Sequence, residues 1–308
     1  SLFHKFDYVY SDCGEAPNAG WPCKLNQWIY HSKYISEWGD LIGRGGFYDS
    51  KPKWFKFLLG WYYLWADLYF RSSADIVMVL SDYMREYAEK RGILKKKIVV
   101  VPGGAQCDML PYIPIDKSAQ PFNKNILVFG YIGIGDGEIM DLIPLINVIQ
   151  EPKYKERFKI VATGQRISRE IINKYNLHDI LIEYGWIDFY HDFQKWQFVD
   201  VFILMKRDVE KERVAWPNKL GDYLSIGRPV LVTPYGDVKK FVNENPEGFI
   251  PLAMERESVM EKLDNILLKK YDFEHMGKIN RIVAEEKISW DARVNTLIQY
   301  LSTEFQTN

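Results

Sequence analysis

Residues 214–236, VAWPNKLGDYLSIGRPVLVTPYG, place a lysine in the first turn of a short predicted helix. Pro217 stands at the expected start of the helix and Gly227 just past its end, and an apolar run that predicts a strand follows. A helix that begins above the carboxyl end of a parallel strand directs unpaired N–H groups and partial positive charge into the crevice there. With the charge of Lys219 added, the stretch predicts an anion-binding site suited to a diphosphate.

The loop before this helix carries further cations that extend the predicted anion site. Lys206, Arg207 and Arg213 follow an apolar run, residues 200–205, that predicts a buried strand. A plainer interpretation also accounts for this stretch taken alone, namely that Asn218 and Lys219 only cap and solvate a surface helix. Other parts of the chain are therefore needed to decide between the two.

Two more predicted strands end in small residues that allow a ligand to approach the backbone. The run ILVFGYIGIGDG, residues 126–137, leads into a helix through closely spaced glycines, with Gly130 and Gly133 at the turn. The spacing differs from the dinucleotide fingerprint. Another strand ends at Thr163 and Gly164. Three loops at carboxyl ends of strands are thus expected to converge on one crevice.

Apolar, β-branched runs alternate with helical patterns along the chain, which predicts an α/β protein with parallel sheets. Residues 109–125 contain three prolines and few apolar side chains, so we place the linker near residues 110–122. The expected architecture is two Rossmann-like domains facing a cleft. Residues 1–110 form the first domain, to which residues 288–308 cross back, and residues 122–287 form the second.

The composition limits which partners the protein is expected to bind and indicates its cellular compartment. The 308 residues include 40 basic and 41 acidic residues, so the net charge of −1 offers no global field for nucleic acid. Cys13, Cys23 and Cys107 form neither an even disulfide framework nor a zinc-ligand spacing, which favours a reducing cytoplasm. The chain begins at Ser1 inside an apparently structured segment, from which we expect that its native N-terminus has been removed.

Residues 51–71, KPKWFKFLLGWYYLWADLYFR, are unusually aromatic. At helical spacing the apolar side chains cover nearly all faces, which is typical of a buried helix or of one that meets lipid. Lys56 and Asp67 interrupt the run, so it does not predict a bilayer span. We favour a core helix, with contact at the inner face of the membrane as the alternative.

Four segments together resemble the GT-B glycosyltransferases of family 4, which use nucleotide-sugar donors and retain anomeric configuration. ADIVMVLSDYMREYAEKRGILKKKIVVVPGGAQ is similar to the end of that family's first domain, and NILVFGYIG to the start of its donor domain. WPNKLGDYLSIGRPVLVTPYG is similar to the donor motif, and ISWDARVNTLIQYL to the closing segment that crosses back. The order and spacing of these segments carry the resemblance, which covers most of the chain.

The resemblance implies a site for a UDP- or GDP-sugar as co-substrate, and we expect no bound cofactor. We also expect no metal ion, because no Asp-x-Asp motif stands at the end of a predicted strand and a helix N-terminus with lysines can neutralise a leaving diphosphate. It also implies that the first domain is incomplete, because the family's initial strand, turn and helix do not precede residues 5–12. The donor-binding residues expected from the motifs and the loops are Gly130, Tyr131, Gly133, Thr163, Gly164, Lys206, Arg207, Arg213, Pro217, Asn218, Lys219, Leu220 and Asp222.

Several positions depart from the family pattern. Asp222 stands where a glutamate usually contacts the donor ribose, and Val214 stands where another glutamate lies eight residues earlier. Tyr131 replaces an arginine, and Asp136 with Gly137 replaces a lysine–glycine pair, both of which contact the pyrophosphate in the family. Phosphate binding would therefore depend more heavily on Lys219 and on residues 206–213.

On the acceptor side, the family often has a histidine–aspartate pair after an early strand. Here KYISEWGDLIGRGG places Asp40 at the acid and Gly39 at the histidine. Asp40 and Glu37 are candidates for binding sugar hydroxyls or assisting proton removal. An ordinary turn acid beside glycines is an equal alternative.

The expected reaction is transfer of a hexosyl unit to a hydroxyl of a glycan or lipid-linked acceptor, with retention. Two alternatives stay open at this point. One is a catalytically inactive glycosyltransferase-like subunit that binds a glycan or a partner, and the other is a nucleotide-sugar epimerase on the same fold.

Overall fold

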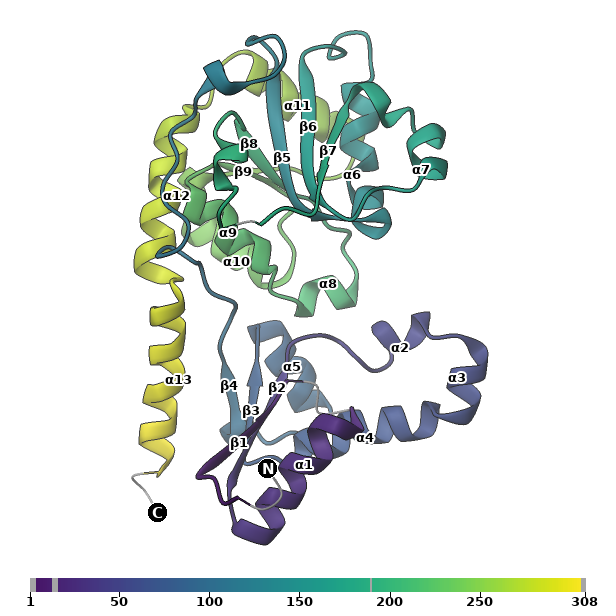
Figure 1. The fold of residues 1–308 in the computed structure, drawn as a ribbon, viewed down its shortest axis with the longest axis vertical. Coiled ribbons are helices and arrows are strands. Elements are labelled where there is room, and N and C mark those ends of the chain that lie inside the picture. Colours follow the sequence, from purple (N-terminus) through teal and green to yellow (C-terminus); the bar gives the residue numbers. More distant parts are fainter. Residues whose placement is uncertain (1–3, 13–15, 189, 306–308) are drawn as a thin grey trace.

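The computed structural model describes residues 4–12, 16–188 and 190–305 and contains two α/β domains, each built on a parallel sheet (Figure 1). The expected fold class is thus confirmed. Cys13, one of the three cysteines considered above, lies outside the described residues, while Cys23 and Cys107 are both free thiols.

The first sheet has the strand order β1-β2-β3-β4, with every pair parallel. Its strands are β1 (Tyr8–Ser11), β2 (Lys33–Trp38), β3 (Ile76–Val79) and β4 (Ile98–Val100). The helices of this domain are α1 (Pro17–Tyr30), α2 (Phe47–Ser50), α3 (Lys53–Leu58), α4 (Gly60–Ser72) and α5 (Asp82–Lys90). Ser81 caps α5, because its hydroxyl accepts a hydrogen bond from the Met84 amide at 2.8 Å.

The second sheet has the strand order β10-β9-β8-β5-β6-β7, again all parallel. Its strands are β5 (Leu127–Ile134), β6 (Phe158–Gly164), β7 (Leu181–Gly185), β8 (Val201–Leu204), β9 (Val230–Val232) and β10 (Phe249–Pro251). Counted from β5, this is the 3-2-1-4-5-6 order of doubly wound nucleotide-binding sheets. The order reverses between β5 and β8, so the carboxyl ends of these two strands border the crevice where ligands of such sheets bind.

Helices cover both faces of the second sheet, and α13 runs back beside the first domain (Figure 1). They are α6 (Asp136–Ile149), α7 (Arg169–Lys174), α8 (Glu210–Val214), α9 (Asn218–Ile226), α10 (Gly236–Glu244), α11 (Arg256–Leu267), α12 (Phe273–Lys287) and α13 (Trp290–Phe305). Helix α9 begins after Pro217 and ends at Gly227, whose φ of 77° suits glycine, as the sequence predicts.

Successive side chains of the strands in the second domain point to opposite faces of the sheet and form a hydrophobic cluster on each face. Val128 and Phe129 are adjacent in β5 and fully buried, yet they belong to hydrophobic clusters on opposite faces of the sheet. On one face, Phe202 of β8 stacks on Tyr223 of α9 with ring centroids 4.2 Å apart and an interplanar angle of 4°. This packing fixes α9, and with it Lys219, against the sheet.

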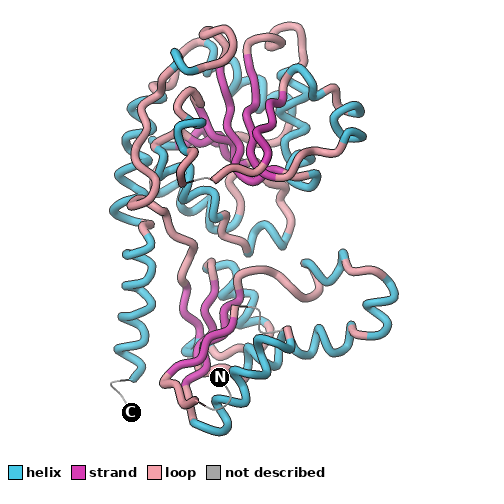
Figure 2. Tube along the Cα trace, viewed as in Figure 1, coloured by secondary structure: helices cyan, strands magenta, loops and turns pink. Residues whose placement is uncertain are grey.

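Two segments join the domains. The chain between β4 and β5 is largely loop (Figure 2), and Arg228 binds it by donating hydrogen bonds to the carbonyls of Ile113 and Pro114. Helix α13 packs Leu297 and Leu301 against the first sheet. The limits of the two domains at residues 110–122 stay a prediction.

Some elements differ from the sequence expectation. The short strands β7 and β10 have no counterpart among the strands that the sequence analysis names. Residues 210–214 form α8 inside a stretch expected to be a loop. These elements are only three to five residues long, which leaves too few periods for a clear hydrophobic pattern.

The favoured interpretation of residues 51–71 as a core helix is wrong for the first half of the segment, since α3 buries no residue, whereas α4 buries Ala66 and Phe70 in the core. The chain breaks between α3 and α4 at Leu59, and at Gly60, the first residue of α4, a Cβ atom would lie 2.6 Å from the Tyr48 hydroxyl. Helices α2, α3 and α4 extend beyond the sheet as an arm (Figure 1) that exposes Trp54, Phe57 and Trp61 by 62%, 86% and 71%. Within the described ranges, no helix has the length and apolar character that a bilayer span requires.

Candidate functional site

A cavity of about 320 Å³ lies at the point where the order of the second sheet reverses. Lys206 follows β8, and Pro217 and Lys219 come from the start of α9. Asp40 and Phe47 of the first domain also line the cavity, so both domains contribute to it. The cavity is therefore where the sequence places the donor crevice.

Lys219 is half-buried against Tyr131 of β5. Its Nζ donates a hydrogen bond to the Tyr131 hydroxyl at 3.1 Å and lies 4.1 Å from the centre of that ring. Burial lowers the pKa of Lys219 to about 8, and the positive charge of Lys206 adds to this effect. Such an ammonium has lost much of its water and gains strongly from an anionic ligand.

Lys206 contributes a second ammonium to the same cavity. Its backbone N–H donates to the Thr233 hydroxyl at 2.8 Å, and that hydroxyl donates to the Lys206 carbonyl at 2.9 Å, which fixes the start of the loop. Its Nζ lies 3.5 Å from Glu212 Oε2 and 3.7 Å from Asp141 Oδ2. The two lysines therefore face a cavity in which carboxylates offset part of their charge.

Arg207 and Arg213, which were expected to bind the donor, do not line the cavity. Arg207 Nε donates to Asp141 Oδ1 at 2.6 Å, and its side chain is largely exposed. Arg213 forms a bidentate ion pair with Asp208, with Nη2 2.7 Å from Oδ2. Both guanidinium groups thus have carboxylate partners outside the cavity.

The predicted glycine turn is only partly open to a ligand. A Cβ atom at Gly130 would lie 2.5 Å from Phe202, so this glycine allows strands β5 and β8 to pack closely. Gly133 has φ of 72° and open space where a side chain would be. Thr163 is buried, and Gly164, with φ of 127°, packs against Ile134. Of these residues, only Gly133 is open toward solvent.

The remaining residues of the motif in α9 have different surroundings. Leu220 is fully buried in the core, and Asn218 is exposed beside Gly103, which leaves room for its side chain. Asp222 is half-buried, and burial raises its pKa to about 7, against the opposing effect of the Lys219 charge. Burial, and then the charge of Asp222, raise the pKa of Tyr190. Asp222 thus lies near Lys219 on the same helix, but it does not line the cavity.

On the first domain, Asp40 is exposed and lines the cavity, whereas Glu37 does not. Glu37 lies near the end of β2, where burial and then the charge of Asp40 raise its pKa. The carboxyl end of β2 therefore places one acid in the cavity and a second acid behind it.

The cavity also contains acids and other polar residues that the sequence analysis did not select. Glu138 lies in the first turn of α6, directly after the glycine turn, and Glu212 lies on α8. Thr233 and Tyr235 follow β9. Glu138, Thr233 and Tyr235 could have been selected from the sequence, because each comes shortly after the carboxyl end of a predicted strand. Those ends meet at one edge of the sheet.

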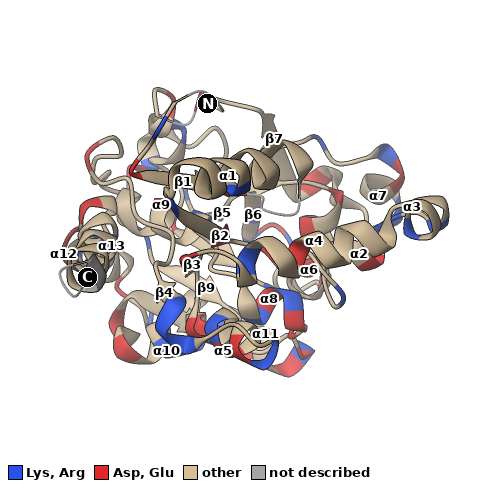
Figure 3. Ribbon diagram, turned by 90° about the horizontal axis from the view of Figure 1, so that it is seen from below, with Lys and Arg blue, Asp and Glu red and all other residues tan. Residues whose placement is uncertain are grey.

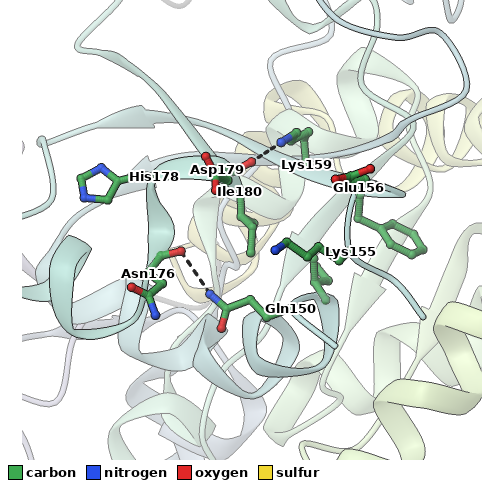
Figure 4. A pocket seen from close by; sticks show the side chains of 10 residues that line it. Gln150, Lys155, Glu156, Lys159, Asn176, His178, Asp179 and Ile180 are labelled. Carbon is green, nitrogen blue, oxygen red and sulfur yellow. Dashed lines mark hydrogen bonds between the residues drawn. The ribbon is translucent and has the colours of Figure 1, made fainter. Parts of the chain in front are cut away.

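A larger hollow of about 680 Å³ lies elsewhere, beside the amino ends of β6 and β7 (Figure 4). Gln150, Lys155, Lys159 and Asn176 are among its lining residues. Lys159 donates to the Asp179 carbonyl, and Gln150 Nε2 donates to the Asn176 carbonyl at 3.2 Å. Because ligands of doubly wound sheets bind at the carboxyl ends, we do not assign the donor to this hollow.

No family model and no curated protein sequence matches this chain. The structure is similar to that of HepE from Anabaena in complex with UDP, with a TM-score of 0.74, 13% identity, and 97% and 79% of the two chains covered. It is also similar to sucrose-phosphate synthase from Thermosynechococcus elongatus (TM-score 0.72, 15% identity, 98% and 75% covered). A third similar structure is WaaG, a glycosyltransferase involved in lipopolysaccharide biosynthesis (TM-score 0.63, 13% identity, 93% and 83% covered). The chain thus has the GT-B fold that its sequence segments indicate.

Proposed function

We propose that this protein is a retaining glycosyltransferase that moves a hexosyl unit from a UDP- or GDP-sugar to a hydroxyl of a glycan or lipid-linked acceptor. One observation carries the proposal. Lys206 and Lys219 face a cavity at the reversal point of a doubly wound sheet, and Asp40 of the other domain lines the same cavity. Solved structures of the same fold, such as HepE, contain UDP and glucose.

In this proposal the donor diphosphate binds beside Lys206 and Lys219, with the N-terminus of α9 adding its partial positive charge. The nucleoside then extends toward Asp222, and the acceptor hydroxyl approaches from the side of Asp40. Glu37 does not line the cavity and has no direct contact with the acceptor in this proposal. Arg207 and Arg213 have a secondary role, because both are paired with carboxylates.

The proposed chemistry takes place on one face of the sugar. The bond between the anomeric carbon and the diphosphate oxygen breaks, and the acceptor oxygen bonds to the same carbon from the same side. The leaving diphosphate accepts the acceptor's proton, and the two lysines stabilise the negative charge that develops on it. We propose that no metal ion is needed, so transfer should persist in excess EDTA.

A second candidate is a catalytically inactive subunit of the same fold. It is favoured by the acids of the cavity, because Glu138 and Glu212 offset the charges of the lysines and weaken the attraction for a diphosphate. An inactive relic of this kind should bind a glycan or a protein without binding a nucleoside diphosphate.

Calorimetric titration with UDP and GDP separates these candidates. The transferase is expected to bind one of the two with micromolar affinity, about −8 kcal/mol, and to prefer it over the other. With the preferred nucleotide known, chromatography of a reaction with the matching labelled sugar donor should show a new glycoside rather than free epimerised sugar. Absence of binding to both nucleotides would favour the inactive subunit.

We also propose that the arm binds an anionic membrane surface, and thereby approaches a lipid-linked acceptor. Its exposed Trp54, Phe57 and Trp61 are apolar, and Lys51 and Lys53 beside them match the charge of anionic headgroups. Lys56 is held against the arm, since its Nζ donates to the Asp49 carbonyl at 2.8 Å.

Flotation with vesicles that contain anionic phospholipid tests this contact. The wild type is expected to float, and the double variant Trp54→Ser, Trp61→Ser is expected to stay in the soluble fraction. Trp186→Ser is the matched control, because Trp186 is 81% exposed and follows β7 of the second domain, so it is not part of the arm. Wild-type protein that remains soluble, or a double variant that floats equally well, would exclude the arm as a membrane contact.

A further inference from the structure

The start of α5 is a point of contact between the two domains. Helix α5 of the first domain lies against α8 and α10 of the second, as Figure 3 shows from below. The Ser81 hydroxyl, which caps α5, donates to the Val214 carbonyl at the end of α8 at 2.6 Å. The residue after Val214, Ala215, lines the donor cavity.

Asp237 makes the second part of this contact. Its carboxylate accepts hydrogen bonds from the backbone amides of Asp82 and Tyr83, at 2.5 Å and 3.2 Å. Amides in the first turn of a helix have no partner within it and carry partial positive charge, so a carboxylate binds them with charge-assisted hydrogen bonds. The Lys240 ammonium lies 3.2 Å from Asp82 Oδ2 and offsets the repulsion between the two acids.

The contact is directly coupled to the donor cavity. Asp237 lies in the first turn of α10, and Tyr235 and Val238, two residues before it and one after it, both line the cavity. The first domain brings Asp40 to the same cavity from the end of β2. Separation of α5 from α10 would therefore withdraw Asp40 from the lysines of the second domain.

We propose that Asp237 is a positioning residue for transfer, which holds Asp40 of the first domain against the donor cavity of the second through the first amides of α5. This inference rests on the proposed function. Asp237 touches neither reactant and acts by fixing the relative position of the domains. Its loss should therefore reduce turnover while leaving the donor site of the second domain intact.

The variant Asp237→Ala tests the proposal, with Asp272→Ala as the matched control. Asp272 also binds a helix N-terminus, accepting from the His275 amide at 3.0 Å, but it does so within the second domain. Asp237→Ala is expected to lower kcat at least fivefold, to leave the Kd for the nucleoside diphosphate within twofold, and to raise the radius of gyration in X-ray scattering. Asp237→Asn, which keeps a neutral acceptor, should fall between the wild type and the alanine variant.

Asp272→Ala should change none of these three quantities and lower only the thermal midpoint. The proposal is overturned if Asp237→Ala keeps kcat within twofold of the wild type, or if kcat and diphosphate affinity fall in parallel. A wild type that binds no nucleoside diphosphate would instead remove the proposed function, and the positioning role with it. Melting curves of all variants identify any that fail to fold, and Asp237→Asn then carries the test.

Discussion

Replacement of Lys219 by methionine removes a charge that the proposed function places beside the donor diphosphate. The methionine keeps an apolar stem over Tyr131, whose ring centre is 4.1 Å from the lysine Nζ, so the local packing should persist. The change therefore tests charge with little change of shape.

The expected loss follows from the surroundings of the ammonium. A hydrogen bond to a charged group in a partly desolvated site contributes roughly 1.5 to 3 kcal/mol, which corresponds to a loss of affinity of about ten- to a hundredfold. The unliganded protein should become more stable, because burial lowers the pKa of Lys219 to about 8 and its charged form is unfavourable there.

The sign of this stability effect can be checked against pH. Between pH 8 and about 10.5 an unfolded chain keeps the lysine proton that the folded protein has lost. The free energy of unfolding of the wild type should therefore rise with pH in this window, and Lys219→Met should abolish that rise.

Calorimetry with the preferred nucleoside diphosphate and with its uncharged nucleoside measures the binding effect. Diphosphate affinity should fall as stated while nucleoside affinity stays constant. Lys155→Met is the control, because Lys155 is an exposed lysine at the far hollow and its loss should not alter binding. A change in diphosphate affinity of less than twofold in Lys219→Met would refute the anion-site interpretation of α9.

Three further predictions concern the same cavity. The diphosphate affinity of the wild type should decrease by up to tenfold per pH unit above pH 8, because Lys219 loses its proton there. Titrations at pH 7, 8 and 9 measure this decrease, and an affinity that does not change with pH would contradict it. Asp222→Asn should stabilise the unliganded protein more at pH 8 than at pH 5, because burial raises the pKa of Asp222 to about 7 and its ionised form is the unfavourable one; equal changes of melting temperature at both pH values would contradict this. Asp40→Asn should reduce transfer at least tenfold and change diphosphate Kd by less than twofold, and equal losses in both assays would exclude an acceptor-side role.

Much of the fold was predictable because its longer elements carry clear local signals. The alternation of β-strands with helices and the proline and glycine that bound α9 appear in the structure where the sequence places them. The short elements β10 and α8 were missed, since three to five residues give no periodicity to detect. The aromatic arm was assigned to the core because composition alone does not tell which apolar face finds a partner.

The candidate site was predicted less completely than the fold. Of the three loops expected to converge, residues 206–217 contribute to the cavity lining, whereas Gly133 and Gly164 at the other two turns do not. Ion pairs and packing contacts between residues far apart in the sequence decide which side chains line the cavity. No local sequence pattern encodes these contacts. Arg207 binds Asp141 and Arg213 binds Asp208, so neither is available to the cavity. Gly130 packs against Phe202. Glu138 lines the cavity although it belongs to no motif that the sequence analysis identified.

A crystal structure with the preferred nucleoside diphosphate tests the central claim most directly, because it locates the donor. Phosphate oxygens are expected within hydrogen-bond distance of Lys206 Nζ and Lys219 Nζ, above the ends of β5 and β8 and facing Asp40. A nucleotide bound in the hollow beside Lys155 and Lys159, or one whose phosphates lie away from both Lys206 and Lys219, would contradict it.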